Sequence, residues 1–282
     1  MSSLARQTIW VDASDQSLDP RSMTTLVSNA ARQPEVPGPR PMVKICDQDP
    51  GDYFDSIAEI IFDRPLCIAR QKQAKGELVH IQKLECATLA RNILKDFNDQ
   101  TTHRSFRQLL GGYRHGGMAF LLWEPVEVSV EQIMAAQGII KATEVIAIAK
   151  PVLEGIRHLA DHGRVLNVLN AKTILLTATG QVKIAGIENS IQIDPEAMDA
   201  ATMKLSALAH VISGLIKKNP ASYEWSPMIK NLLLQLETRS ANEILQTTPF
   251  NPGPPIDELV MMTNITNKTA HHRVKYSDRG ED

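Results

Sequence analysis

The order of hydrophobic and polar positions predicts a strand-rich first part of the chain. Apolar runs at 53–61, 66–71 and 77–84 are separated by the turn-forming segments 62–65 and 73–76, a pattern that predicts an antiparallel meander. A helical period follows at 85–97, and two more strand-like runs lie at 106–113 and 118–124. Together these runs predict a small lobe of five strands and one helix.

From Val130 onward the apolar period becomes helical. Segments 131–137 and 143–163 carry apolar residues at helix spacing, including Val145, Ile148, Val152 and Ile156. Two strand-like segments, 165–169 and 173–186, interrupt the helices, and Thr179-Gly180 supplies a hairpin turn in the second of them. The pattern therefore predicts an α+β fold, in which a small β-rich lobe at 46–123 precedes a larger, mainly helical lobe at 124–250.

The two ends of the chain differ from this middle part. Residues 1–45 are rich in Ser, Arg and Pro, and we expect a disordered N-terminal arm because such a composition buries too little apolar surface to offset ordering. Residues 251–282 open with NPGPP, and we expect a mostly disordered C-terminal tail in which 256–262 can dock as a short helix.

Composition and charge exclude several classes of protein. The chain has 282 residues, 43% of them hydrophobic, which suits one two-lobed domain. A net charge of −2 gives no field that favours nucleic acid or an anionic membrane. Cys46, Cys67 and Cys86 lack CxxC spacing and predict neither disulfides nor a zinc site. With no long apolar run, we expect a soluble intracellular protein, cytoplasmic or nuclear, that binds neither membrane nor nucleic acid.

Three segments, taken in order, resemble a known family. Residues 173–186 read TILLTATGQVKIAG and resemble the NILLxxxGxVKIxDFG stretch of eukaryotic serine/threonine protein kinases. Residues 156–176 resemble the end of the long lower-lobe helix and the catalytic loop, and residues 226–250 resemble the last helices of the lower lobe. The resemblance covers about 45–250 and implies a two-lobed protein kinase-like fold with a small β-rich N-lobe and a larger helical C-lobe.

The same resemblance implies that the catalytic residues have been replaced. Phosphoryl transfer requires positioned phosphates, metal ligands and a carboxylate that orients the attacking hydroxyl. Val168 stands at the position of the catalytic Asp, while Thr173 and Gly186 stand at the two metal-ligand positions. Gln82 replaces the third-strand Lys, and the adjacent Lys83 points to the opposite face by strand alternation. We therefore expect no catalytic residue and no metal site.

The same alignment implies that the positions lining the kinase nucleotide pocket are also substituted. The three glycine positions of the phosphate-covering loop hold bulky side chains or a ring, His80 stands where the family has a small residue against the purine, and Trp123 gates the back of the pocket. The degenerate pocket positions are Ile60, Phe62, Pro65, His80, Trp123, Glu124, Val126 and Leu175. We expect His80 and Trp123 to fill the pocket as core, with the indole N–H bonded to the backbone. The alternative is a small-molecule site narrower than ATP.

Two further positions concern structure rather than chemistry. The segment Asp194-Pro195-Glu196 resembles the Ala-Pro-Glu signature, and Arg239 aligns with the Arg that pairs with its Glu. The resemblance therefore implies a structural ion pair between Glu196 and Arg239, whose loss should cost more stability than the loss of Arg164, which we expect in a loop. Lys204 replaces the helix Asp that braces an active catalytic loop, and we expect that brace to be lost.

These positions predict a pseudokinase, a catalytically inactive kinase-like protein that acts as a protein-binding scaffold or allosteric regulator. We expect a protein partner, with an active kinase as one candidate, no cofactor and no ATP binding. The alternative is residual nucleotide binding or weak, non-standard kinase activity that uses Glu188, Lys83 or Glu85 in unusual roles. A decayed paralogue without a selected function is the third hypothesis.

Overall fold

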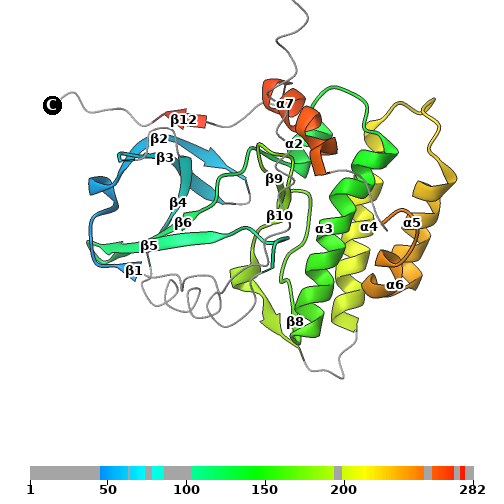
Figure 1. Ribbon diagram of the computed structural model, residues 1–282, viewed down its shortest axis with the longest axis horizontal. Coiled ribbons are helices and arrows are strands. Elements are labelled where there is room, and N and C mark those ends of the chain that lie inside the picture. Colours follow the sequence, from blue (N-terminus) through cyan, green and yellow to red (C-terminus); the bar gives the residue numbers. More distant parts are fainter. Residues whose placement is uncertain are drawn as a thin grey trace, which may run out of the picture. The chain divides into compact units, whose positions relative to one another are not determined.

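The alternating apolar positions of the first part of the chain form the middle of a mixed seven-stranded sheet (Figure 1). The computed structural model describes residues 45–62, 64–73, 78–85, 103–193, 199–250, 256–269 and 274–276, all within one compact unit, Met42–Asp282. Its strand order is β1-β5-β6-β4-β3-β2-β12. The strands are β1 (Ile45–Cys46), β2 (Phe54–Ile61), β3 (Pro65–Gln71), β4 (Leu78–Leu84), β5 (Leu109–His115), β6 (Met118–Trp123) and β12 (Val274–Tyr276).

The predicted meander is confirmed at β2, β3 and β4, which pair antiparallel in that order. The predicted helix at 85–97 lies almost wholly outside the described residues. The sequence missed the two edge strands, because β1 is two residues long, pairs parallel with β5, and carries no periodic signal. At the other edge, β12 pairs antiparallel with β2, so three residues from the far end of the chain belong to the same sheet.

Helices dominate the second part of the chain, as its apolar period predicted (Figure 1). They are α2 (Val130–Ala135), α3 (Ala142–Asp161), α4 (Asp199–Lys218), α5 (Pro227–Thr238), α6 (Ala241–Leu245) and α7 (Val260–Thr269), with the short 3-10 helices η2 (Ile187–Asn189) and η3 (Ile256–Leu259); a third 3-10 helix, η1 (Pro50–Asp52), precedes the sheet strand β2. Two small sheets interrupt them: β7 (Val128–Ser129) with β9 (Ile174–Leu176) and β10 (Val182–Ile184), and β8 (Arg164–Val165) with β11 (Ile191–Gln192).

The predicted hairpin joins β9 to β10. Gly180 has φ 75°, a left-handed conformation that glycine adopts without steric cost, and it ends the turn where the sequence placed it. Gly155 of α3 serves a different purpose, since a Cβ at that position would lie 2.7 Å from Cδ1 of Ile184. The absence of a side chain therefore lets α3 approach β10 closely.

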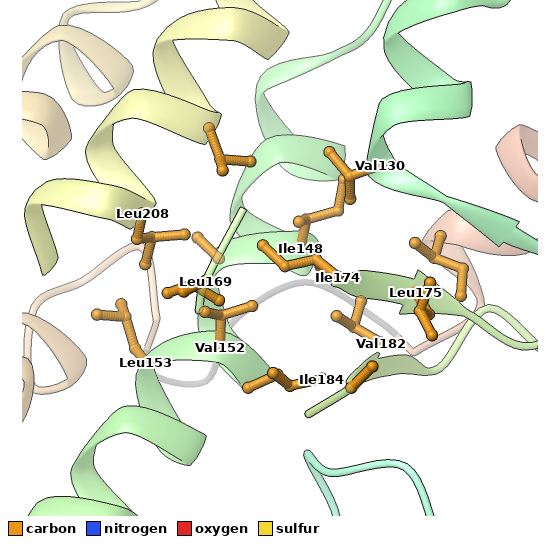
Figure 2. Packing of buried hydrophobic residues seen from close by; sticks show 14 of the residues in the cluster. Val130, Ile148, Val152, Leu153, Leu169, Ile174, Leu175, Val182, Ile184 and Leu208 are labelled. Carbon is orange, nitrogen blue, oxygen red and sulfur yellow. The ribbon is translucent and has the colours of Figure 1, made fainter. Parts of the chain in front are cut away.

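The apolar stripe of α3 forms the centre of the hydrophobic core (Figure 2). Ile148, Val152 and Leu153 are fully buried, and in Figure 2 they lie near Leu208 of α4 and the β9–β10 hairpin. Burial of a large aliphatic side chain contributes about 1.5–3 kcal/mol, so this stripe is a main source of the fold's stability. The described residues thus form an α+β fold with a mixed sheet and several helices.

The described part of 251–282 is more ordered than the composition suggested. We expected a mostly disordered tail with a short helix at 256–262, whereas η3 and α7 form one continuous helical segment from Ile256 to Thr269. Leu259, Met262, Thr263 and Thr266 are buried, and α7 contacts α2 and β7. Burial of these side chains offsets the entropy cost of ordering this helical segment. None of the helices within the described ranges has the length and apolar character needed to cross a bilayer.

Candidate functional site

Polar side chains are buried where the sheet meets the segment that follows β10. His80 and Gln82 come from β4, Trp123 ends β6, Arg107 precedes β5, and Glu188 lies in η2. Each is at most 9% exposed. Buried polar groups require hydrogen-bonding partners to offset their desolvation, so each of these side chains should have one. We call these five residues, together with Arg64, Lys183 and Glu124, the polar cluster.

Arg107 is the centre of the polar cluster. Its side chain is bonded to the sheet on two sides: Nε donates to the backbone oxygen of Glu124 at 3.0 Å, and Nη2 lies 2.7 Å from Nδ1 of His80. The guanidinium also lies 5.8 Å from the ring centre of Trp123, within cation–π range. Burial, and then the charge of Arg107, lower the pKa of His80 to about 3. The imidazole is therefore neutral at pH 7, and its Nδ1 accepts a hydrogen bond from Nη2–H of Arg107.

Trp123 and Gln82 satisfy each other. The indole Nε1 of Trp123 donates to Oε1 of Gln82 at 3.0 Å, and the two residues are 3% and 7% exposed. We expected a backbone partner for the indole, and the structure provides a side-chain partner instead. Gln82 thus has a structural role at the position compared with the third-strand Lys, while Lys83 is exposed on the opposite face as strand alternation predicted.

An ion pair closes the polar cluster. Arg64, between β2 and β3, places Nη1 2.5 Å from Oε1 of Glu188, whose side chain is only 2% exposed. The cavity between them, lined also by Gln82, Arg107, Trp123 and Gly186, has a volume of about 10 Å³, enough for about one water molecule. Oε2 of Glu188 is buried and has no hydrogen-bonding partner among the described residues. The ion pair therefore ties the turn before β3 to η2 across a nearly filled space.

A second buried ion pair lies next to Arg107 and was not predicted. Lys183, in the middle of β10, is 3% exposed and places Nζ 3.2 Å from Oε1 of Glu124. The same oxygen accepts the backbone N–H of Gln108 at 2.7 Å. The signal in the sequence was a single lysine between Val182 and Ile184 in a strand that is otherwise apolar, since a buried lysine is seldom left unpaired.

The positions compared with the catalytic residues carry no carboxylate. Val168 is 51% exposed. Thr173 is 5% exposed, and its hydroxyl closes a local turn by donating to the oxygen of Asn170 at 3.0 Å. Gly186, with φ 88°, precedes the first turn of η2. Glu188 is the one carboxylate that lines the cavity among the described residues.

The pocket positions are filled by side chains. Phe62 is 6% exposed and stacks on His80 with ring centres 6.1 Å apart. Ile60, Val126 and Leu175 belong to the hydrophobic core, whereas Pro65 is exposed at the start of β3. Phe62 therefore packs against the His80 side of the polar cluster, and both side chains are buried.

The structural positions gave mixed results. Glu196 lies outside the described residues, so its pairing with Arg239 stays a prediction; Arg239 itself is exposed at the C-cap of α5. Arg164 is not in a loop, because it belongs to β8 and donates to Oγ and the backbone oxygen of Ser190 at 2.9 and 2.8 Å. The loss of a brace from α4 was also wrong, since Nζ of Lys204 donates to the backbone oxygen of Asn167 at 2.9 Å.

Neither metal ligation nor similarity to known proteins adds a function to this geometry. Within the parts of the chain that the structure describes, no group of three or more His, Cys, Asp or Glu side chains is arranged to hold a metal ion. No protein-family model matches the chain, and no curated protein matches it. Within the polar cluster, Arg64 pairs with Glu188 and Lys183 pairs with Glu124. Arg107 is bonded to His80 and to a backbone oxygen, and the cavity beside these groups leaves little space for a ligand.

Proposed function

We propose that this chain is a catalytically inactive, protein kinase-like protein that acts by binding another protein, as a scaffold or allosteric regulator. The observation that carries the proposal is the Arg64–Glu188 ion pair. Under the kinase resemblance, this pair would span the space that an active kinase keeps open for nucleotide. Phosphoryl transfer depends on electrostatic stabilisation by preorganised groups, and here the charged groups stabilise one another instead.

The arrangement of elements supports a two-lobed kinase-like architecture. A β-rich part precedes a helical part, and the β9–β10 hairpin, whose sequence resembles the kinase family, lies between the core helix α3 and the polar cluster. Lys204 supports it as well, because a contact from α4 to the backbone of the loop at Asn167 is kept although the Asp is gone. The Lys204 contact holds a loop that has no catalytic side chain. This fits a protein that acts through its binding surface and not through catalysis.

Exposure of Val168 supports the loss of phosphoryl transfer. An apolar side chain that is 51% exposed can neither accept a proton nor hold a substrate hydroxyl. The free thiols of Cys46, which is exposed, and Cys67, which is half-buried, form no disulfide and are consistent with action in a reducing compartment inside the cell.

A phosphoryl-transfer assay tests the proposal. The purified chain and its Val168→Asp variant would be incubated with labelled ATP and Mg²⁺ or Mn²⁺, with a generic protein substrate and without one. We expect no label above the buffer control for either protein, because Thr173, Gly186 and Gln82 still lack the metal and phosphate contacts. Metal-dependent labelling of either protein contradicts the proposal.

Residual nucleotide binding is the second candidate, and one observation favours it. Oε2 of Glu188 is buried without a hydrogen-bonding partner, two residues after Gly186. If the Arg64–Glu188 pair opened, that carboxylate would be a possible ligand for a nucleotide-bound metal ion. This candidate requires that ATP and Mg²⁺ raise the melting temperature of the wild-type chain and that Glu188→Gln abolish the rise. The first candidate requires no rise in either protein.

A further inference from the structure

Helix α7 has a second face that the fold leaves uncovered. One side of the helix is buried through Met262, Thr263 and Thr266. On the opposite side, Met261 is 69% exposed and Ile265, one helical turn later, is 39% exposed. Scattered apolar residues are normal on a protein surface, whereas neighbouring ones on a single helix face indicate an interaction site.

The uncovered face of α7 continues into a groove beside it. The loop between α2 and α3 contributes Ile139, which is 59% exposed. Ile139, Met261 and Ile265 line a groove of about 110 Å³, together with Lys218 and Gly138. Nζ of Lys218 donates to the backbone oxygens of Ala136 and Gly138 at 2.6 Å each, which holds the wall of the groove in place.

Charged residues lie at both ends of this face, with opposite signs. Glu258 precedes Met261 by three positions, and Lys268 follows Ile265 by three. Glu258 belongs to η3, and a 3-10 helix has three residues per turn, so Glu258 lies on about the same side as Met261. Along this face an acidic residue is followed by two apolar residues and then a basic one. Neighbouring members are three, four and three positions apart, so the spacing is the same when the face is followed from either end.

We propose that this face binds a second copy of the chain, with the two α7 helices packed antiparallel about a two-fold axis. In that arrangement Met261 of one copy meets Ile265 of the other, and Glu258 of each copy meets Lys268 of the other. A two-fold contact needs a self-complementary surface, and this sequence of side chains is self-complementary in the antiparallel direction alone. A parallel arrangement would bring like charges together at both ends.

The end charges are available for this contact. Lys268 is exposed and makes no ion pair with any described residue. Among the described residues, the carboxylate of Glu258 accepts one hydroxyl, that of Thr143 at 2.6 Å. Because α7 has ten residues, and the contact is short compared with a standard interface, the dimer is weak, with a dissociation constant on the order of 10 μM. Self-association of this kind is independent of the proposed function, since it uses no residue of the polar cluster.

Sedimentation velocity of the full-length chain tests the proposal. From about 1 to about 200 μM protein, the weight-average sedimentation coefficient rises from the monomer toward the dimer value. Met261→Asp abolishes the rise, because it places a charge at the centre of the contact. Leu234→Asp leaves it unchanged; Leu234 is the matched control because it is 59% exposed on α5. Circular dichroism confirms that both variants are folded.

Charge exchange makes the test specific for the antiparallel pairing. Glu258→Lys and Lys268→Glu each lose self-association, because each homodimer then brings two like charges together at both ends. Mixed in equal amounts, the two variants form a heterodimer, since every end contact is again between opposite charges. A wild-type chain that stays monomeric up to about 200 μM overturns the proposal. Self-association of either single variant at wild-type strength, or failure of the mixture to associate, overturns it too.

Discussion

Two buried places in this molecule are built from opposite kinds of residue. Around α3 and the β9–β10 hairpin, the side chains are aliphatic and almost fully excluded from water, as at Ile148, Leu153 and Ile174 (Figure 2). One strand away, β10 carries Lys183 at the same depth, paired with Glu124 next to Arg107. The hydrophobic core and the polar cluster thus lie side by side in one unit, and each has a different cost when it is disturbed.

The difference explains where stability and specificity come from. Apolar packing is non-directional and contributes in proportion to buried area, so the core stabilises the fold whatever partners a single side chain has. A buried charge contributes only while its partner stays in place, and desolvation can cancel the gain. We infer that the polar cluster fixes how the sheet meets η2, since its pairs connect separate segments of the chain; Arg64 and Glu188 are 124 positions apart.

The largest expected effect comes from the core. Leu153→Ala removes a fully buried side chain between α3 and α4 and should lower the free energy of unfolding by about 2–5 kcal/mol. The matched control is Leu234→Ala on α5, where the side chain is 59% exposed and the change should stay within about 0.5 kcal/mol. Urea unfolding followed by circular dichroism measures both. Equal effects in the two variants would show that the core is not where we place it.

The polar cluster should respond almost as strongly to the loss of one charge. Lys183→Met leaves the partly buried Glu124 carboxylate without its cation and should cost about 3 kcal/mol. The same substitution at Lys172, whose pair with Glu131 is more than half exposed, should cost less than about 1 kcal/mol. Adding Glu124→Leu to Lys183→Met should recover part of the loss, because no unpaired charge is then left. If the double variant had a lower free energy of unfolding than Lys183→Met alone, this explanation would be contradicted.

His80 should make stability depend on pH in a window that the core does not affect. Burial and Arg107 lower its folded-state pKa to about 3, against an ordinary value of 6.5. Below pH 6.5 the unfolded chain therefore takes up a proton that the folded chain refuses, and stability falls as the pH drops from 6.5 toward 3. His80→Gln should remove up to about 1.4 kcal/mol per pH unit from that slope. Unfolding curves at pH 7.5, 6.5 and 5 measure it, and an unchanged slope would mean that His80 is solvated.

The smallest effects concern two arginines at the surface of the helical part. Arg164→Ala should cost about 1 kcal/mol, because it removes two hydrogen bonds to Ser190 that hold β8 beside η2. Arg239→Ala should cost less, since the side chain is exposed and exposed pairs contribute at most about 1 kcal/mol. This order is the reverse of the one the sequence suggested. Thermal melts compare the two, and a clearly larger loss for Arg239→Ala would show a buried pair with Glu196.

Local signals predicted the elements, while long-range pairing was beyond the sequence. Period-two and helical patterns gave β2 to β4 and α3, because each pattern depends on residues close together in the chain. The two-residue strand β1 and the distant strand β12 have no local signal of their own. The same reasoning applies to the site. Pocket-filling roles for His80 and Trp123 were predicted from the sequence, yet their partners Arg107 and Gln82 depend on how separate strands align.

The ion pairs show most clearly what residue types alone do not reveal. Lys183 and Glu188 were present in the sequence as a lysine within a strand and an acid after a glycine, and each had several possible partners. Only the paired arrangement of β10, η2 and the turn before β3 selects Glu124 and Arg64. The stability order of Arg164 and Arg239 stays a prediction, because Glu196 lies outside the described residues. The bonds from Arg164 to Ser190 depend on packing that a motif register does not contain.

Direct titration with ATP and Mg²⁺ tests the central claim, that the polar cluster occupies the space where nucleotide would bind. A ligand present at one hundred times its dissociation constant adds about 2.7 kcal/mol to the stability of the folded state, which a thermal melt of the full-length chain detects readily. We predict no shift in the melting temperature with ATP up to about 5 mM in the presence of Mg²⁺, and no shift after Glu188→Gln. A magnesium-dependent rise in the wild-type melting temperature that Glu188→Gln removes would contradict the account.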